Sequence, residues 1–368
     1  MENLAHTLFG LTLAKAGLER VTPLAATTLV ISSNLPDADV VMRLRGGALS
    51  YIEHHRGLTH SFVGLVALAA GLTLILVYLD RKFRLRRDPF RRPIRPWRIF
   101  ILACVGGLGH LFLDFTNTYG VRPLLPFSRR WFYGDIAFIV DPWIWLILGS
   151  AVVWLMPKDA LRAAVWLVIG VTLSMIMALA FHEPSEELPV AIPITVRVIW
   201  FAGLFVIVFG LLLGWSRAGG RLARASLFVL ALYYGGMWIA QQTAIGQTAA
   251  SPPAAPVTSG AAWPTPANPL LWQRVASTDE NIFISYANVL DPRGGWRDLP
   301  ALDYRFVEPL RSYETSRKFL EFARYASARV EEREDGYHLA LHDIRFPLRM
   351  NVVLDRDLVV QSAEVFGF

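Results

Sequence analysis

The chain has 368 residues, of which 54% are hydrophobic and 18% are charged, and its mean hydropathy is +0.39. This composition is too apolar for an ordinary water-soluble enzyme of this length and indicates a membrane protein. The net charge of +6 comes from basic residues beside apolar runs, where they set membrane topology, so we expect no nucleic-acid partner. The single cysteine, Cys104, excludes a disulfide framework or a cysteine-based zinc site within one chain.

The first part of the chain contains two short apolar segments, residues 4–18 and 23–33, which predict a short or re-entrant helical hairpin. Longer apolar runs follow, each near the ~20 residues that a helix needs to cross a bilayer. These runs are 61–79, 98–115, 136–156, 160–181, 194–215 and 222–240. The sequence therefore predicts a mostly α-helical, polytopic membrane domain with about six spans.

The C-terminal part has a different composition. Residues 241–269 are rich in Ala, Pro, Thr and Ser, which indicates a linker. Beyond it, residues 312–330 predict an amphipathic helix, and the β-branched and aromatic content of three further stretches predicts strands. Those stretches are 281–290, 337–346 and 351–366. We expect four regions: a metal-site membrane domain (1–150), additional transmembrane helices (151–240), the linker (241–269) and a small α+β soluble domain (270–368).

The orientation of the chain follows from the loop at residues 80–98, because cytoplasmic loops carry an excess of Lys and Arg. Its basic residues are Arg81, Lys82, Arg84, Arg86, Arg87, Arg91, Arg92, Arg95 and Arg98. The loop at residues 182–189 contains Glu and neither Lys nor Arg. We expect the basic loop to be cytoplasmic and the C-terminal domain to be extracytoplasmic.

Polar residues gather where the predicted topology brings three helix ends to the outer membrane face. His60 starts the first long span, and His110 and Asp114 lie near the end of the second. A spacing of four residues places His110 and Asp114 on one helix face, where a single cation can bridge them. A hydrogen bond within a polar bundle interior is the alternative role for this pair.

Two more stretches contribute to this group. A turn at Gly57 would direct His55 and His60 inward; alternatively, one imidazole forms a hydrogen bond at the interface while Arg56 contacts lipid phosphate. Asp37 and Asp39 follow an apolar segment, where they would act as oxygen ligands or as a general base. Turn or cap roles are the alternative for Asn34 and Asp39.

Together these residues predict an N/O ligand set without sulfur, which suits one or more divalent ions, preferably zinc, with manganese or iron as alternatives. The candidate metal ligands are His6, Asp37, His55, His60, His110 and Asp114. The candidate catalytic residues are Asp37, Asp39 and Arg56. Asp135 and Asp141 are candidates for further carboxylates around the site.

The order of His6, N-L-P-D-A-D at 34–39, H-R-G-L-T-H-S at 55–61 and G-H-L-F-L-D-F-T-N-T-Y-G at 109–120 resembles one bacterial family. This is the family of membrane-bound metal-dependent hydrolases typified by the inner-membrane protein YdjM, and the resemblance covers roughly residues 1–150. It implies a location in the bacterial cytoplasmic (inner) membrane and a distant likeness to zinc-dependent phospholipase C and P1-type nucleases. By this resemblance the metal ligands are His6, Asp37, His60, His110 and Asp114.

These observations favour a membrane-bound, metal-dependent hydrolase that acts on phosphoester bonds of membrane lipids or lipid-linked substrates at the outer face. The alternative is a metal or solute transporter that uses the same residues as a binding site. A zincin-type protease ranks lower because the signature H-E-x-x-H is absent. His338 and His342 fall on a predicted strand, where a solvated face explains them. The sequence leaves the oligomeric state open.

Overall fold

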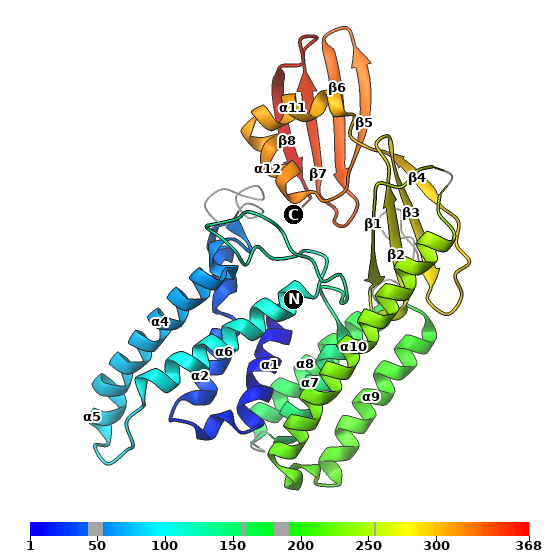
Figure 1. Cartoon of the computed structure of the whole chain (residues 1–368). Helices are drawn as coiled ribbons and strands as arrows, with labels where there is room; N and C mark the ends of the chain where they lie inside the picture. Colours follow the sequence, from blue (N-terminus) through cyan, green and yellow to red (C-terminus); the bar gives the residue numbers. More distant parts are fainter. Residues whose placement is uncertain (43–53, 156–158, 180–190, 254, 368) are drawn as a thin grey trace. The chain divides into compact units, whose positions relative to one another are not determined.

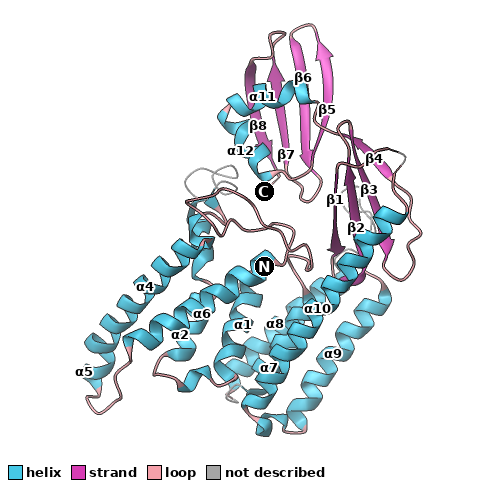
Figure 2. Cartoon of the chain, viewed as in Figure 1, coloured by secondary structure: helices cyan, strands magenta, loops and turns pink. Residues whose placement is uncertain are grey.

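A computed structural model describes residues 1–42, 54–155, 159–179, 191–253 and 255–367 (Figure 1). The loop predicted at residues 182–189 lies outside them. The chain divides into two compact units. Unit 1 comprises Met1–Ala38, Leu58–Trp238 and Thr265–Pro269, and unit 2 comprises Asp39–Gly57, Ile239–Pro264 and Leu270–Phe368. Helices dominate the first part of the chain and strands the last part (Figure 2).

Unit 1 begins with the two short helices that the sequence predicted. Its N-terminal elements are α1 (Asn3–Lys15), η1 (Leu18–Arg20), α2 (Ala25–Ser32), η3 (Leu58–His60), α4 (Phe62–Leu79), η4 (Asp80–Arg84), α5 (Leu85–Arg87) and α6 (Pro96–Phe115). A further short helix, η2 (Leu35–Met42), contains the boundary between the units. Helices α1 and α2 pack against each other and against α6, which confirms the helical hairpin.

Glycines allow these helices to pack closely. A Cβ atom on Gly106 would lie 2.0 Å from Oγ of Ser32, and one on Gly109 would lie 2.2 Å from the ring of Phe9. Real Cβ contacts are not that short, so larger residues would push α6 away from α1 and α2. Small residues at helix interfaces are the usual means of close packing in membranes.

The remaining helices of this part of the chain are α7 (Pro142–Leu155), α8 (Ala160–Leu179), α9 (Ile194–Leu212), η5 (Trp215–Ala218) and α10 (Gly220–Ala250). Among the described residues, four helices are long and apolar enough to cross a membrane: Phe62–Arg87, Pro96–Phe115, Ile194–Leu212 and Gly220–Ala250. The stretches Pro142–Leu155 in α7 and Ala163–Leu179 in α8 are apolar but shorter. Each of the six expected runs contains a helix, and the count of six spans stays a prediction.

Helix α7 begins later than predicted because the residues before it form a folded connection. Isolated bridges join Asn117 to Ala137 and Val121 to Phe132. Asp141 then caps the helix by accepting hydrogen bonds from the backbone nitrogens of Trp143 (2.9 Å) and Ile144 (3.4 Å). A capping aspartate followed by proline is a frequent start of a helix.

The stretch expected to be a linker is largely regular, which corrects the interpretation of residues 241–269. Helix α10 continues to Ala250, and β1 and β2 occupy most of the rest. Polar side chains anchor the extension: the amide of Gln241 donates to the carbonyl oxygen of Ala262 at 3.3 Å, and that of Gln247 to the carbonyl oxygen of Val289 at 3.0 Å. Tertiary hydrogen bonds thus order a segment whose composition is typical of linkers.

Two four-stranded sheets follow, with strand orders β1-β2-β3-β4 and β5-β6-β7-β8. Their strands are β1 (Ser259–Thr265), β2 (Asn268–Ser277), β3 (Asn281–Asn288), β4 (Arg297–Pro300), β5 (Ala326–Arg333), β6 (Gly336–Asp343), β7 (Arg349–Leu354) and β8 (Val360–Phe366). Helices α11 (Tyr304–Ser312) and α12 (Glu314–Phe322) lie between the sheets in sequence. Strands were predicted near β3, β6, β7 and β8.

One boundary of that region was predicted wrongly. The helix expected at residues 312–330 ends at Phe322, and β5 occupies residues from Ala326 onward. Strand β5 is antiparallel to β6, with Arg333 opposite Gly336, whose φ of 137° suits glycine at the hairpin turn. Pairing with a strand that lies later in the chain therefore overrides the helical pattern of the local sequence.

Candidate metal centre

Five of the six predicted metal ligands converge in unit 1. His6 lies near the start of α1, Asp37 on η2, and His60 at the end of η3. His110 and Asp114 lie near the C-terminal end of α6. The side chains of the three histidines and of Asp114 are 0% exposed, and that of Asp37 is 11% exposed. We call this group the His/Asp cluster.

The ring nitrogens and carboxylate oxygens of the cluster face one another. Nε2 of His60 lies 3.3 Å from Oδ1 of Asp37 and 3.3 Å from Oδ2 of Asp114. Nε2 of His110 lies 3.3 Å from Oδ2 of Asp114, 3.6 Å from Oδ1 of Asp37 and 3.0 Å from Nε2 of His60. Nε2 of His6 lies 3.5 Å from Oδ1 of Asp114 and 3.9 Å from Oδ2 of Asp37. The amino group of Met1 also donates to Oδ1 of Asp114.

This spacing fits a small divalent cation. Ligand atoms of Asp37, His60, His110 and Asp114 all lie within 4.8 Å of one another. Tetrahedral ligands placed about 2.0–2.2 Å from a zinc ion are roughly 3.4 Å apart, close to the distances given above. An ion at this position would also stabilise the two carboxylates and the imidazoles, whose burial without a cation is unfavourable.

The surroundings of His6 independently favour a cation at the cluster. Its ring stacks on that of His110, with 3.8 Å between centroids and 22° between planes. Among the described residues, neither Nδ1 nor Nε2 of His6 has a hydrogen-bond partner, although both are buried. A buried polar atom without a partner is destabilising, and a cation held at Nε2 would remove that penalty.

One backbone carbonyl and one side-chain hydroxyl orient the rings of His110 and His60. Nδ1 of His110 lies 2.8 Å from the carbonyl oxygen of Ser33, and Nδ1 of His60 lies 3.0 Å from Oγ1 of Thr59. Each contact leaves Nε2 directed toward the cluster, as is usual for metal-binding histidines. The sequence did not predict the role of Ser33, although its carbonyl lies at the C-terminal cap of α2, where backbone acceptors remain available.

Asp37 keeps its charge in this setting. Burial favours the neutral carboxyl group, yet the hydrogen bond with His60 and the nearby imidazoles hold the pKa of Asp37 below its usual value. An ionised carboxylate is the form that binds a cation, so the local electrostatics agree with the geometry.

The other candidates, Asp39, His55 and Arg56, belong to unit 2 and contact one another. Oδ1 of Asp39 lies 2.9 Å from Nδ1 of His55, and its Oδ2 accepts a hydrogen bond of 3.1 Å from the backbone nitrogen of Arg56. Arg56 adopts a left-handed φ of 56°, and a Cβ on Gly57 would lie 2.6 Å from the carbonyl oxygen of His54. The turn expected at Gly57 is therefore present.

Several polar residues near the cluster have structural roles. Asn34 donates to the carbonyl oxygen of Val30 at 2.8 Å and accepts from Thr7 at 3.2 Å, so it fixes the end of α2 on α1. Asp141 caps α7 and accepts a hydrogen bond of 2.7 Å from Tyr233. Among the described residues, neither Asp135 nor Asp141 belongs to a group of converging metal-ligand atoms.

The His/Asp cluster could bind a divalent metal, and four apolar helices among the described residues are long enough to cross a membrane; together they define a membrane protein with a candidate metal site. Comparison with known proteins gives the family. The chain belongs to the YdjM inner membrane protein family, whose profile matches residues 1–184, half of the sequence. The match includes every residue of the His/Asp cluster, and it confirms the resemblance found in the motifs.

The chain is also similar to the uncharacterized protein YfhP of Bacillus subtilis (strain 168). The two are 29% identical over 165 residues, which cover 42% of this chain and 46% of YfhP. The chain thus matches about half the length of this curated relative. No solved structure matches this chain.

Proposed function

We propose that the protein is a membrane-bound, metal-dependent hydrolase that acts on phosphoester bonds of lipids or lipid-linked molecules. The observation that carries the proposal is the His/Asp cluster, in which ligand atoms of Asp37, His60, His110 and Asp114 all lie within 4.8 Å of one another and Nε2 of His6 lies 3.5 Å from Oδ1 of Asp114. His6, Asp37, His60, His110 and Asp114 would hold the metal, with zinc best matched to these N and O donors and manganese or iron as alternatives. When bound, such an ion supplies Lewis acidity and an activated water.

The pair of Asp39 and His55 supports a further role. Only Ala38 separates Asp39 from Asp37, so chain geometry keeps their Cα atoms within about 7 Å. Both oxygens of Asp39 are engaged, one by His55 and one by the backbone of Arg56. We therefore assign Asp39 the task of orienting His55, and His55 that of a second-ion ligand or proton acceptor.

Two arginines offer positive charge for a phosphate group. Arg56 and Arg122 are 3% and 8% exposed. The guanidinium carbon of Arg122 lies 4.5 Å from the ring centroid of Trp131, which limits its motion. Guanidinium groups bind phosphate oxygens in a bidentate manner, so a phosphoester substrate is the class that these residues fit best.

The test compares metal content and hydrolysis in detergent-purified protein. Wild type should retain a divalent metal and hydrolyse bis-(nitrophenyl) phosphate or a phospholipid, whereas His60→Ala and His110→Ala should lose both. The control is His338→Ala, because His338 lies in β6 and pairs with Asp335 at 3.1 Å. If metal-loaded wild type hydrolyses neither compound but moves a solute across vesicles, the protein is a transporter and the proposal is wrong.

A further inference from the structure

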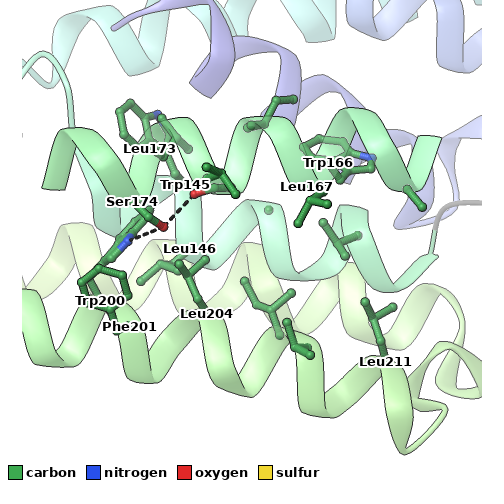
Figure 3. A pocket seen from close by; sticks show the side chains of 18 of the residues that line it. Trp145, Leu146, Trp166, Leu167, Leu173, Ser174, Trp200, Phe201, Leu204 and Leu211 are labelled. Atoms are coloured by element: carbon green, nitrogen blue, oxygen red, sulfur yellow. Dashed lines mark hydrogen bonds between the residues drawn. The ribbon is translucent and has the colours of Figure 1, made fainter. Parts of the chain in front are cut away.

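Helices α1, α7, α8 and α9 of unit 1 enclose a cavity of about 1020 Å³ (Figure 3). Sites for small molecules usually measure about 300–1,000 Å³, so this cavity is large enough for a ligand. It lies on a different side of α1 from the His/Asp cluster. Leu4 and Leu8 form part of its wall. His6 is two positions from each of them, hence about 200° around the helix, and faces the cluster.

The cavity wall is almost entirely hydrocarbon and indole. Ser174 and Asp159 are the only residues with hydroxyl or charged side chains among the described residues that line it. The hydroxyl of Ser174 donates to the carbonyl oxygen of Gly170 at 2.7 Å and accepts a hydrogen bond of 3.5 Å from Nε1 of Trp200. Asp159 is exposed. A polar or charged ligand would therefore be poorly solvated here, whereas an alkyl chain fits the chemistry of the wall.

The dimensions of the cavity suit a lipid chain. Its wall on α8 extends from Ala163 to Ala178, which is about 22 Å at 1.5 Å per residue. The hydrocarbon layer of one leaflet is about 15 Å thick. Leu167 and Leu212 line the cavity and are also 67% and 79% exposed, so it opens onto apolar surface that faces bilayer lipid.

One end of the cavity carries two of its three indoles and the hydroxyl of Ser174. Trp145, Ser174 and Trp200 lie together there, and Trp166 and Leu211 lie toward the other end (Figure 3). Nε1 of Trp145 donates to the carboxylate of Glu2, which caps α1. Helices α7, α8 and α9 alternate in direction, so the start of α7, the end of α8 and the start of α9 lie at one end of the cavity. Helix α6 also terminates at this end, with His110 and Asp114. Tryptophan prefers the level of lipid headgroups, so this end suits the polar part of a lipid.

We propose that this cavity binds one hydrocarbon chain of a membrane lipid, with the polar end of the lipid beside Trp145 and Trp200. The inference rests on the proposed function in one respect: it specifies the substrate as a lipid with at least one long alkyl chain. Helix α1 then serves two purposes, since one of its faces holds the metal through His6 and the other contacts the chain through Leu4 and Leu8.

Two glycines make the cavity testable. Gly149 and Gly170 both line it, and a Cβ atom on either would meet no atom within 4 Å. Gly170→Phe should place its ring in the cavity without displacing a helix, and Gly149→Leu is a smaller version of the same change. Gly235 on α10 is exposed, and a Cβ there also meets nothing, so Gly235→Phe is the matched control.

The experiment uses the full chain in nanodiscs that contain a phosphatidylglycerol with a diazirine in its acyl chain. After irradiation, labelled peptides are mapped by mass spectrometry. Wild type and Gly235→Phe should be labelled at cavity residues such as Trp145, which is 6% exposed, and Leu204. Gly170→Phe should lower that labelling about tenfold, because overpacking a filled site is unfavourable by one or more factors of ten. Metal content should be equal in all three proteins, which shows that the variant is folded.

Unchanged labelling in Gly170→Phe and Gly149→Leu would overturn the lipid site. Hydrolysis separates this inference from the proposed function. For an active enzyme, Gly170→Phe should raise KM for a long-chain phospholipid and leave turnover of bis-(nitrophenyl) phosphate unchanged; equal KM for the phospholipid would refute the substrate assignment. If wild type is labelled in the cavity but hydrolyses nothing, the lipid site stands and the hydrolase proposal fails.

Discussion

His6 and Asp141 are both buried polar residues, yet their surroundings differ. Asp141 accepts hydrogen bonds from two backbone nitrogens and from Tyr233, so its burial is compensated within the protein. Among the described residues, the ring nitrogens of His6 have no such partner. At the scale of single residues, Asp141 is part of the scaffold, and His6 is a group prepared for a ligand.

His6→Phe should separate stability from metal binding. Phenylalanine keeps the ring stacked on His110 and removes two unpartnered nitrogens, which are unfavourable by about 1–3 kcal/mol. In a chelator, we expect the thermal unfolding temperature of the variant to equal or exceed that of wild type. With zinc present, the increase seen in wild type should be lost or much smaller. A variant that is clearly less stable than wild type in the chelator would show that His6 is already satisfied without metal.

Tyr233→Phe should lower stability and leave metal binding unchanged, which is the reverse of the result expected for His6→Phe. It removes the hydrogen bond to a buried carboxylate and should destabilise the protein by about 1–3 kcal/mol, with metal content unchanged. Tyr304→Phe is the control, because Tyr304 is 88% exposed. Denaturation in detergent followed by metal analysis measures both effects. Loss of metal in Tyr233→Phe would place Asp141 in the metal-binding machinery.

At the scale of elements, the close contact of α1, α2 and α6 sets the geometry of the cluster. The sequence predicted that His110 and Asp114 share a face, because residues four apart lie on the same face of any α-helix. It did not predict the carbonyl of Ser33 as the partner of His110, since backbone acceptors have no residue-specific signature. Nor did it predict β5 or the extension of α10, because both depend on partners far along the chain.

Gly106→Val tests that close contact. The added atoms would collide with Ser32, so α6 must move away from α2, and His110 would separate from the carbonyl of Ser33. We expect a loss of stability of about 1–3 kcal/mol together with weaker metal retention. In Gly71→Val on α4, a new Cβ meets nothing within 4 Å, and both properties should be unchanged. Equal metal retention in the two variants would contradict the proposed dependence on helix packing.

For the whole molecule, the distribution of basic residues predicts that the two ends of the membrane part face opposite compartments. Five helices, α6 to α10, separate the basic loop from the sheets, and two of them, α7 and α8, are not among the four candidate spans. If both cross the bilayer there are five crossings, and if neither does there are three. The number is odd in both cases, so the predicted sidedness holds as long as α7 and α8 either both cross or both do not.

Cysteine labelling measures this sidedness. In a Cys104→Ala background, Phe90→Cys in the basic loop and Leu290→Cys after β3 introduce thiols at positions that are 99% and 78% exposed. A membrane-impermeant maleimide should label Leu290→Cys in intact spheroplasts, and Phe90→Cys only after the membrane is permeabilised. Labelling of both positions from the same side would show that the predicted topology is wrong.

The place of the cluster within the chain has a consequence for biosynthesis. All five residues lie between His6 and Asp114, so every ligand has been synthesised before α7 is made. At about 5–20 residues per second, Asp114 follows His6 by roughly 5 to 20 seconds. The nascent chain therefore presents a full set of donors to metal ions while both sheets are still untranslated. Metal supply during membrane insertion would then influence how securely α1 docks, and cells starved of the ion would accumulate chains that fail at this first step of assembly.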